Sequence, residues 1–202
     1  MINNINLIKS LLNFEDEDDF YMLYIFKRKK DQPEEEKDNH QSVRTIRSYC
    51  ISSIEQLDKK YNEIKMLCEV FKARAYIHVQ KQNHKDVSLD MLVDLAQRIK
   101  SGQHRQQNLF DSIVGQMKTL EKRWIIDIDT ISLYDCKPIM DFIDTLKPVG
   151  HKTEMIIPTK NGYHLITGKF DVMKFKEKYP DVDIQKKNPT LLYYPDSLDI
   201  QD

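Results

Sequence analysis

Residues 123–130 read RWIIDIDT, a short apolar run that ends in two carboxylates, Asp127 and Asp129. The run has the length and composition of a buried strand, in which alternate side chains point to the same face. Two carboxylates on one face repel and are costly to bury unless a cation neutralises them. We therefore expect a site for a hard divalent cation, Mg²⁺ or Mn²⁺. The alternative is a strand that runs out into a polar turn, with both carboxylates solvated.

The segments that follow this run alternate between strand and helix patterns. Asn161-Gly162, between two apolar runs, predicts a β-hairpin. The predicted order is mostly β-α-β-β-α-β, the split βαβ arrangement of RNA-recognition-motif (RRM) folds and polymerase palms. The predicted strands are 124–129, 154–158, 163–167, 182–184 and 190–194, and the predicted helices are 136–147 and 171–178.

The first half also mixes helices with strands. Ser53 and Gln56 are spaced as a capping box at the start of a helix. The predicted strands are 20–26, 43–50 and 73–79, and the other predicted helices are 2–13, 88–100 and 105–118. We therefore expect an α+β fold in which an N-terminal α/β part, residues 1–120, packs on an RRM-like catalytic part, residues 121–202. The two parts are expected to form one compact domain.

Composition excludes several classes of protein. The chain has 202 residues, 31 basic and 32 acidic, so its net charge of -1 gives no global nucleic-acid footprint. Its three cysteines form no CxxC pair, which argues against a zinc knuckle and suits a reducing cytoplasm. No apolar stretch predicts a membrane span or a signal peptide. The basic run 27–30 (KRKK) is interpreted as a solvated loop edge, with a nucleic-acid clamp as the alternative.

His164 lies on the outgoing arm of the predicted hairpin. In a β-α-β-β-α-β sheet the first and third strands are neighbours, so the carboxylate pair and His164 can converge on one face. The motifs Asp127-Ile128-Asp129, Gly162-Tyr163-His164 and Val182-Asp183 occur in this order. In this order and type they resemble the motifs of the archaeo-eukaryotic primase superfamily, which includes primase catalytic subunits and primase-polymerases.

The resemblance implies roles for these residues. Asp127, Asp129 and Asp183 would bind Mg²⁺ or Mn²⁺, although Asp181 competes with Asp183 as the third ligand. His164 would contact the triphosphate of the incoming nucleotide and belongs with Asp127 and Asp129 to the catalytic set. The alternative for His164 is a structural histidine, and for Asp183 a solvated surface residue.

Several basic residues are candidates for phosphate binding. Lys160 and Lys169 flank the hairpin and its second strand and would add positive charge near the triphosphate. Arg74 alternates with apolar residues in a predicted strand of the first half and would reach the nucleotide from there. Lys186 and Lys187 are candidates for contacts with the nucleic-acid backbone.

These expectations favour a metal-dependent nucleotidyltransferase that makes or extends primers from nucleoside triphosphates on a single-stranded DNA template. A replicative helicase is a possible partner, a membrane is not, and the expected location is the cytoplasm of a bacterial, phage or mobile-element host. One alternative is a non-catalytic replication accessory module that binds single-stranded nucleic acid through exposed aromatic rings. Another is a metal-dependent nuclease or phosphoesterase with His164 as acid or base.

Overall fold

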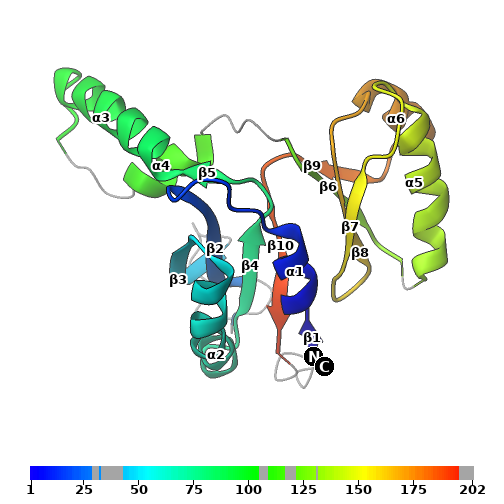
Figure 1. Ribbon diagram of the computed structural model, residues 1–202, viewed down its shortest axis with the longest axis horizontal. Helices are drawn as coiled ribbons and strands as arrows, with labels where there is room; N and C mark the ends of the chain where they lie inside the picture. Colours follow the sequence, from blue (N-terminus) through cyan, green and yellow to red (C-terminus); the bar gives the residue numbers. More distant parts are fainter. Residues whose placement is uncertain (29–31, 33–42, 105–108, 117–121, 131, 196–202) are drawn as a thin grey trace.

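The computed structural model describes residues 1–28, 32, 43–104, 109–116, 122–130 and 132–195. Lys29 and Lys30 of the basic run lie outside these residues. The structure is α+β, as expected, and is built around two antiparallel sheets (Figure 1). No helix among the described residues is both long and apolar enough to cross a membrane.

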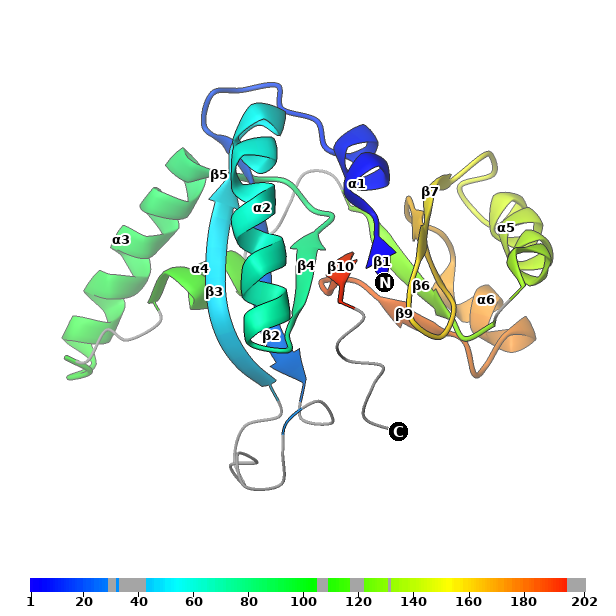
Figure 2. The same ribbon diagram turned by 90° about the horizontal axis from the view of Figure 1, so that it is seen from below.

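The first sheet has six strands in the order β1-β10-β4-β2-β3, with β5 paired to β2 outside this path. Helices α1 and α2 pack on one face and α3 and α4 on the other, as Figure 2 shows from below. The strands are β1 (Ile2–Asn3), β2 (Asp19–Arg28), β3 (Val43–Ile51), β4 (Arg74–His78), β5 (Gln82–Asn83) and β10 (Pro189–Tyr194). The helices are α1 (Ile5–Leu11), α2 (Ile54–Val70), α3 (His84–Lys100) and α4 (Leu109–Gln116).

The second sheet has four strands in the order β7-β8-β6-β9. Helices α5 and α6 cover its outer face and share a core with it (Figure 1). Along the chain the elements are β6 (Trp124–Ile128), a short 3-10 helix (Leu133–Asp135), α5 (Cys136–Thr145), β7 (Thr153–Pro158), β8 (Tyr163–Thr167), α6 (Val172–Lys178) and β9 (Asp183–Gln185).

The sequence analysis placed the C-terminal strand, β10, in the RRM-like part of the chain, residues 121–202, but the structure pairs it with strands of the first half. It leaves the second sheet and lies in the first, between β1 and β4. Leu191, Leu192, Tyr193 and Tyr194 are all buried, so both faces of β10 are covered. A strand of this kind is most stable inside a sheet, and its local pattern cannot say inside which one. The two parts 1–120 and 121–202 are therefore interleaved.

The inner face of the second sheet packs against the first half of the chain. Ile125, Ile157 and Ile166 belong to the same core as Ile8 and Leu11 of α1. The two sheets thus share one continuous apolar core. A residue on the inner face of β6, β8 or β9 consequently faces the junction between the two halves.

Candidate functional site

Strand pairing in the second sheet brings three predicted site residues to one face. Asp127 on β6 lies directly opposite His164 on β8 and, on its other side, directly opposite Asp183 on β9. Opposed residues of antiparallel strands project to the same face, with Cβ atoms about 5 Å apart. His164, Asp127 and Asp183 therefore form a row across three strands. Asp181 precedes β9, so Asp183 is the aspartate placed beside Asp127.

His164 is held by contacts with both sheets. Its Nδ1 lies 2.9 Å from Thr190 Oγ1 on β10, and its Nε2 lies 3.5 Å from Asp127 Oδ1. Burial, together with the nearby positive charge of Arg28, lowers the pKa of His164 to about 4. The ring is therefore neutral at pH 7. A proton on Nε2 satisfies both contacts, because the Thr190 hydroxyl can then donate to Nδ1.

The Asp127 carboxylate is destabilised by its surroundings. Burial raises its pKa most, and the charges of Asp129 and Asp183 raise it further, against smaller opposing effects of Arg28 and Gln185. Gln185 Nε2 donates to Asp127 Oδ2 at 3.3 Å and to Asp183 Oδ2 at 2.9 Å. One amide thus stands between the two carboxylates. A cation in that position would relieve their repulsion more fully than a neutral amide does.

A small pocket of about 70 Å³ gathers most of the predicted site residues. Asp129 lies just beyond the end of β6 and is exposed. Small-molecule sites usually measure roughly 300–1,000 Å³, so this pocket matches a compact polar group better than a whole nucleotide. The predicted residues that line it are Asp127, Asp129, His164, Lys160 and Arg74.

The hairpin between β7 and β8 forms one wall of the pocket. It runs from Thr159 to Gly162, and the Thr159 N–H donates to the Gly162 carbonyl at 2.8 Å, so the predicted hairpin is present. Neither Asn161 nor Gly162 has a positive φ, which an Asn-Gly turn usually requires. Glycine is needed for another reason: a Cβ at position 162 would lie 1.9 Å from the carbonyl oxygen of Ile128. The hairpin therefore packs directly against the end of β6.

Asn4 ties this wall to the first sheet. Its side chain is 2% exposed, and Nδ2 donates to the carbonyls of Pro158 and Leu191, both at 2.9 Å. Pro158 ends β7 and Leu191 lies on β10, so one amide joins the two sheets. The contact between His164 and Thr190 is a second link of the same kind. Sequence reasoning missed Asn4 because its partners are 154 and 187 residues away along the chain.

Arg74 and Lys160 reach the pocket from different sheets and share an aromatic ring. Arg74 Cζ lies 4.6 Å and Lys160 Nζ 5.4 Å from the centre of the Tyr194 ring. Arg74 is 3% exposed, so its cation–π contact is shielded from water and correspondingly stronger. Two cations held at one ring create a local positive field that attracts anions.

Arg28 is a pocket residue that the sequence analysis did not select. The predicted strand ended at Phe26, but β2 continues to Arg28. Phe26 pairs with Arg74, so Arg28, two residues further along, projects to the face of Arg74. Extending the alternation of the predicted strand 20–26 into the basic run 27–30 would have placed Arg28 on the same face as Phe26.

Three lysines that were predicted to bind phosphate or nucleic acid lie away from this pocket. Lys169 follows the far end of β8, about 16 Å of strand from the hairpin, and lines a different pocket. Lys187 Nζ donates to the carbonyls of the last two residues of α4 at 3.1 and 3.3 Å, which stabilises the C-terminal end of that helix. Lys186 Nζ lies 4.9 Å from the centre of the Trp124 ring.

The carboxylates suit a hard cation in their chemistry. In the part of the chain that the structure describes, no three His, Cys, Asp or Glu side chains are gathered closely enough to hold a metal ion as they stand. Mg²⁺ and Mn²⁺ nevertheless prefer carboxylate oxygens, and Asp127 and Asp183 are directly opposed, with Asp129 beside them. Rotation of Gln185 away from Asp127 and Asp183 would free their oxygens for such an ion.

Comparison with models of protein families, with curated protein sequences and with solved structures gave no match.

Proposed function

We propose that the protein is a metal-dependent nucleotidyltransferase of the primase or primase-polymerase kind, which makes or extends primers on a DNA template. The observation that carries this proposal is that one pocket is lined by both acidic and basic side chains. Two acidic residues, Asp127 and Asp129, line the pocket together with the neutral His164. Three basic residues, Arg28, Arg74 and Lys160, line it as well. A metal-bound triphosphate needs both kinds of side chain, because acidic residues can bind its cation and basic residues can bind its anionic phosphates.

The topology of the second sheet supports the same proposal. The chain order β6-α5-β7-β8-α6-β9 and the sheet order β7-β8-β6-β9 correspond to the split βαβ arrangement of RRM-like folds and polymerase palms. The central strands of this arrangement are β6 and β8, which carry Asp127 and His164. Many unrelated functions share this topology, so the proposal rests on the pocket.

The acidic residues and His164 have separate tasks in the proposed reaction. Asp127, Asp129 and Asp183 would hold Mg²⁺ or Mn²⁺, which when bound activates a primer 3′-hydroxyl and offsets charge on the departing pyrophosphate. His164 is neutral and would donate a hydrogen bond from Nε2 to a phosphate oxygen in place of its contact with Asp127. The contact with Thr190 keeps the ring in orientation.

The basic residues would orient the triphosphate. Arg74 is fixed by burial and by the Tyr194 ring, whereas Lys160 lies on the hairpin and Arg28 at the end of β2. Cations that come from three separate elements can contact different phosphate oxygens at the same time. Positioning and fixed charges of this type supply most of the catalysis in phosphoryl transfer.

The two alternative functions have less support. A nuclease that uses His164 as acid or base needs a pKa near 7, whereas the pKa of His164 is lowered to about 4. A binding module of RRM type displays aromatic rings on an open sheet face. The corresponding face of the second sheet instead packs through Ile125, Ile157 and Ile166 into the shared core.

A primer-synthesis assay with nucleoside triphosphates, a single-stranded template and Mn²⁺ or Mg²⁺ tests the proposal. We expect product from the wild type and a loss of roughly 10²- to 10³-fold or more in Asp127→Asn/Asp129→Asn, as for other preorganised electrostatic groups. Asp141→Asn is the matched control, because Asp141 is exposed on α5 and pairs with Lys137. Thermal unfolding confirms that each variant is folded.

Two results would contradict the proposal: no product from the wild type, or undiminished product from the double variant. Shortened DNA formed without nucleoside triphosphates would identify the nuclease alternative. Metal-independent binding of single strands without any product would identify the binding module.

A further inference from the structure

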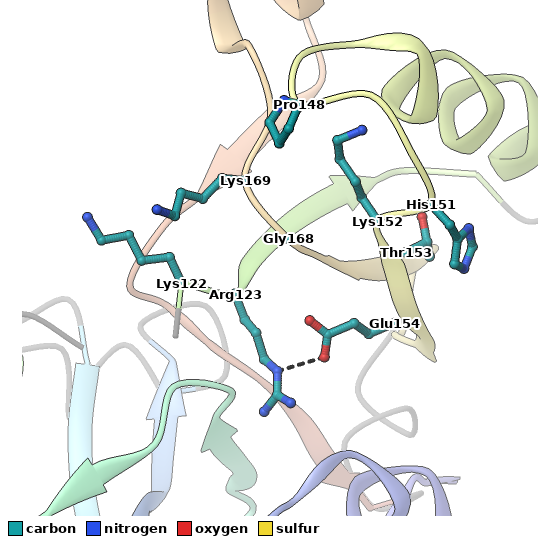
Figure 3. Close-up of a pocket in the computed structure, with 9 residues that line it drawn as sticks. All are labelled: Lys122, Arg123, Pro148, His151, Lys152, Thr153, Glu154, Gly168 and Lys169. Atoms are coloured by element: carbon teal, nitrogen blue, oxygen red, sulfur yellow. Dashed lines mark hydrogen bonds and ion pairs between the residues drawn. The ribbon is translucent and has the colours of Figure 1, made fainter. Parts of the chain in front are cut away.

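A second, wider pocket of about 930 Å³ lies at the opposite end of β6 and β8 from Asp127 and His164 (Figure 3). Nine residues line it, and four of these are Lys or Arg, against one acidic residue, Glu154. The pocket is therefore strongly basic in a protein whose net charge is only -1.

Two of the four cations are committed to the fold. Arg123 Nε forms an ion pair with Glu154 Oε2 at 2.7 Å, drawn as the dashed line in Figure 3. Lys152 is 8% exposed, and its Nζ donates to the carbonyls of Ile143 at 2.9 Å and Gly150 at 2.8 Å. Neither cation is available to a ligand without breaking these contacts.

The remaining two cations, Lys122 and Lys169, are exposed and form no ion pair with any residue within the described ranges. Trp124 pairs with Thr167, so continuing this antiparallel register by two residues sets Lys122 opposite Lys169. Figure 3 shows both side chains extending in the same direction from the ends of the two strands. Lys186 adds a third ammonium group at the same end of the sheet, over the Trp124 ring.

This cluster, Lys122, Lys169 and Lys186, places three exposed ammonium groups at one end of the sheet, where their like charges repel one another. An anionic ligand removes the repulsion and turns it into attraction, which is strongest for an anion with several charges.

We propose that Lys122, Lys169 and Lys186 bind the phosphodiester backbone of a nucleic-acid strand. Among the described residues of the pocket lining there is no Phe, Tyr or Trp on which a base could stack. The Gly168 N–H already donates to the Lys152 carbonyl at 2.9 Å, so it does not contribute to a cradle for a single phosphate. Flexible ammonium groups in an open pocket suit a run of phosphates, read without regard to sequence.

The cluster lies at the opposite end of the second sheet from the first pocket. Lys122 and Asp127 are five residues apart, about 17 Å of extended chain, and strand alternation places them on opposite faces of the sheet. The inference rests on the proposed function for the identity of the polymer, because a primer-synthesising enzyme must hold a nucleic-acid strand.

Fluorescence anisotropy with a labelled single-stranded oligonucleotide of about 12 nucleotides tests the cluster, with chelator present and no nucleoside triphosphate. The variant is Lys122→Ala/Lys169→Ala/Lys186→Ala. The control, Lys59→Ala/Lys85→Ala/Lys100→Ala, removes the same charge from exposed positions on α2 and α3. Thermal unfolding of both variants checks that they are folded.

We expect the cluster variant to bind roughly 10- to 100-fold more weakly at about 0.1 M salt, and the slope of log K against log[salt] to become shallower by about 2. The control should change neither quantity by a comparable amount. Unchanged affinity and slope in the cluster variant, or an equal loss in the control, would overturn the proposal. Displacement of the oligonucleotide by equimolar inorganic phosphate would do so too, because it would indicate a site for a single phosphate.

The assay separates this inference from the proposed function, since it uses neither metal nor nucleotide. If the protein synthesises primers but its affinity for DNA is the same in the cluster variant as in the wild type, only the inference about the lysine cluster is wrong. Lysine-dependent binding by a protein that forms no product would reject the proposed activity alone.

Discussion

Gly162 is the position where a single methyl group should do the most damage. A Cβ added there would lie 1.9 Å from the Ile128 carbonyl oxygen, inside any tolerated contact. Backbone atoms cannot rotate away as a flexible side chain can, so the hairpin must move by about 1.5 Å to restore an ordinary contact of about 3.4 Å. This movement separates the hairpin from β6 at the Ile128–Tyr163 pair.

The cost follows from two terms. Overpacking a well-packed site costs typically 1–3 kcal/mol, and a lost ladder hydrogen bond adds about 1 kcal/mol. We therefore expect Gly162→Ala to lower the free energy of unfolding by about 2–4 kcal/mol. The displaced hairpin also carries Lys160 away from the pocket, so primer synthesis should fall with it.

Urea unfolding followed by circular dichroism measures this loss. Gly115→Ala is the matched control, because a Cβ at Gly115 meets nothing within 4 Å and the residue lies in α4. Replacing a helical glycine by alanine should raise stability by roughly 0.5–1 kcal/mol. A Gly162→Ala protein within about 0.5 kcal/mol of the wild type would refute the packing argument, since that is the range of neutral surface changes.

Two further predictions concern titrating groups. Burial lowers the pKa of His164 from 6.5 to about 4. Between these two pH values His164 is protonated in the unfolded chain but not in the folded one, so the free energy of unfolding decreases as the pH falls from 6.5 to about 4. For His164 this loss amounts to about 3 kcal/mol. Denaturant titrations across this range should therefore show a smaller loss in His164→Asn than in the wild type, and an equal loss in the two proteins would contradict the reasoning. The pKa of Asp127 is raised, so its charge opposes folding at pH 7. Asp127→Asn should therefore be more stable than the wild type at pH 7 while losing activity, and the gain should narrow as the pH falls towards 3.8. A less stable variant at pH 7 would contradict this.

Local patterns located most elements of the fold. Ser53 caps α2 as predicted, with its Oγ accepting the Gln56 N–H at 3.1 Å. The Asn161-Gly162 pair marked a hairpin that is present, although the reason for glycine is close packing and not a positive φ. The short strands β1 and β5 were not predicted, because runs of two residues carry no periodic signal.

The sequence by itself determined that Asp127 lies on a short buried strand, just before Asp129, and that the ordered aspartate and histidine motifs are compatible with one site. Strand alternation is a local property, so it survives whatever the strand pairs with. Only the tertiary structure decided that Asp183 is aligned with Asp127, that Arg28 joins the pocket and that Lys169 lies in another one. Pairing between strands distant in the chain depends on which surfaces can be buried together, and the return of β10 to the first sheet is the clearest case.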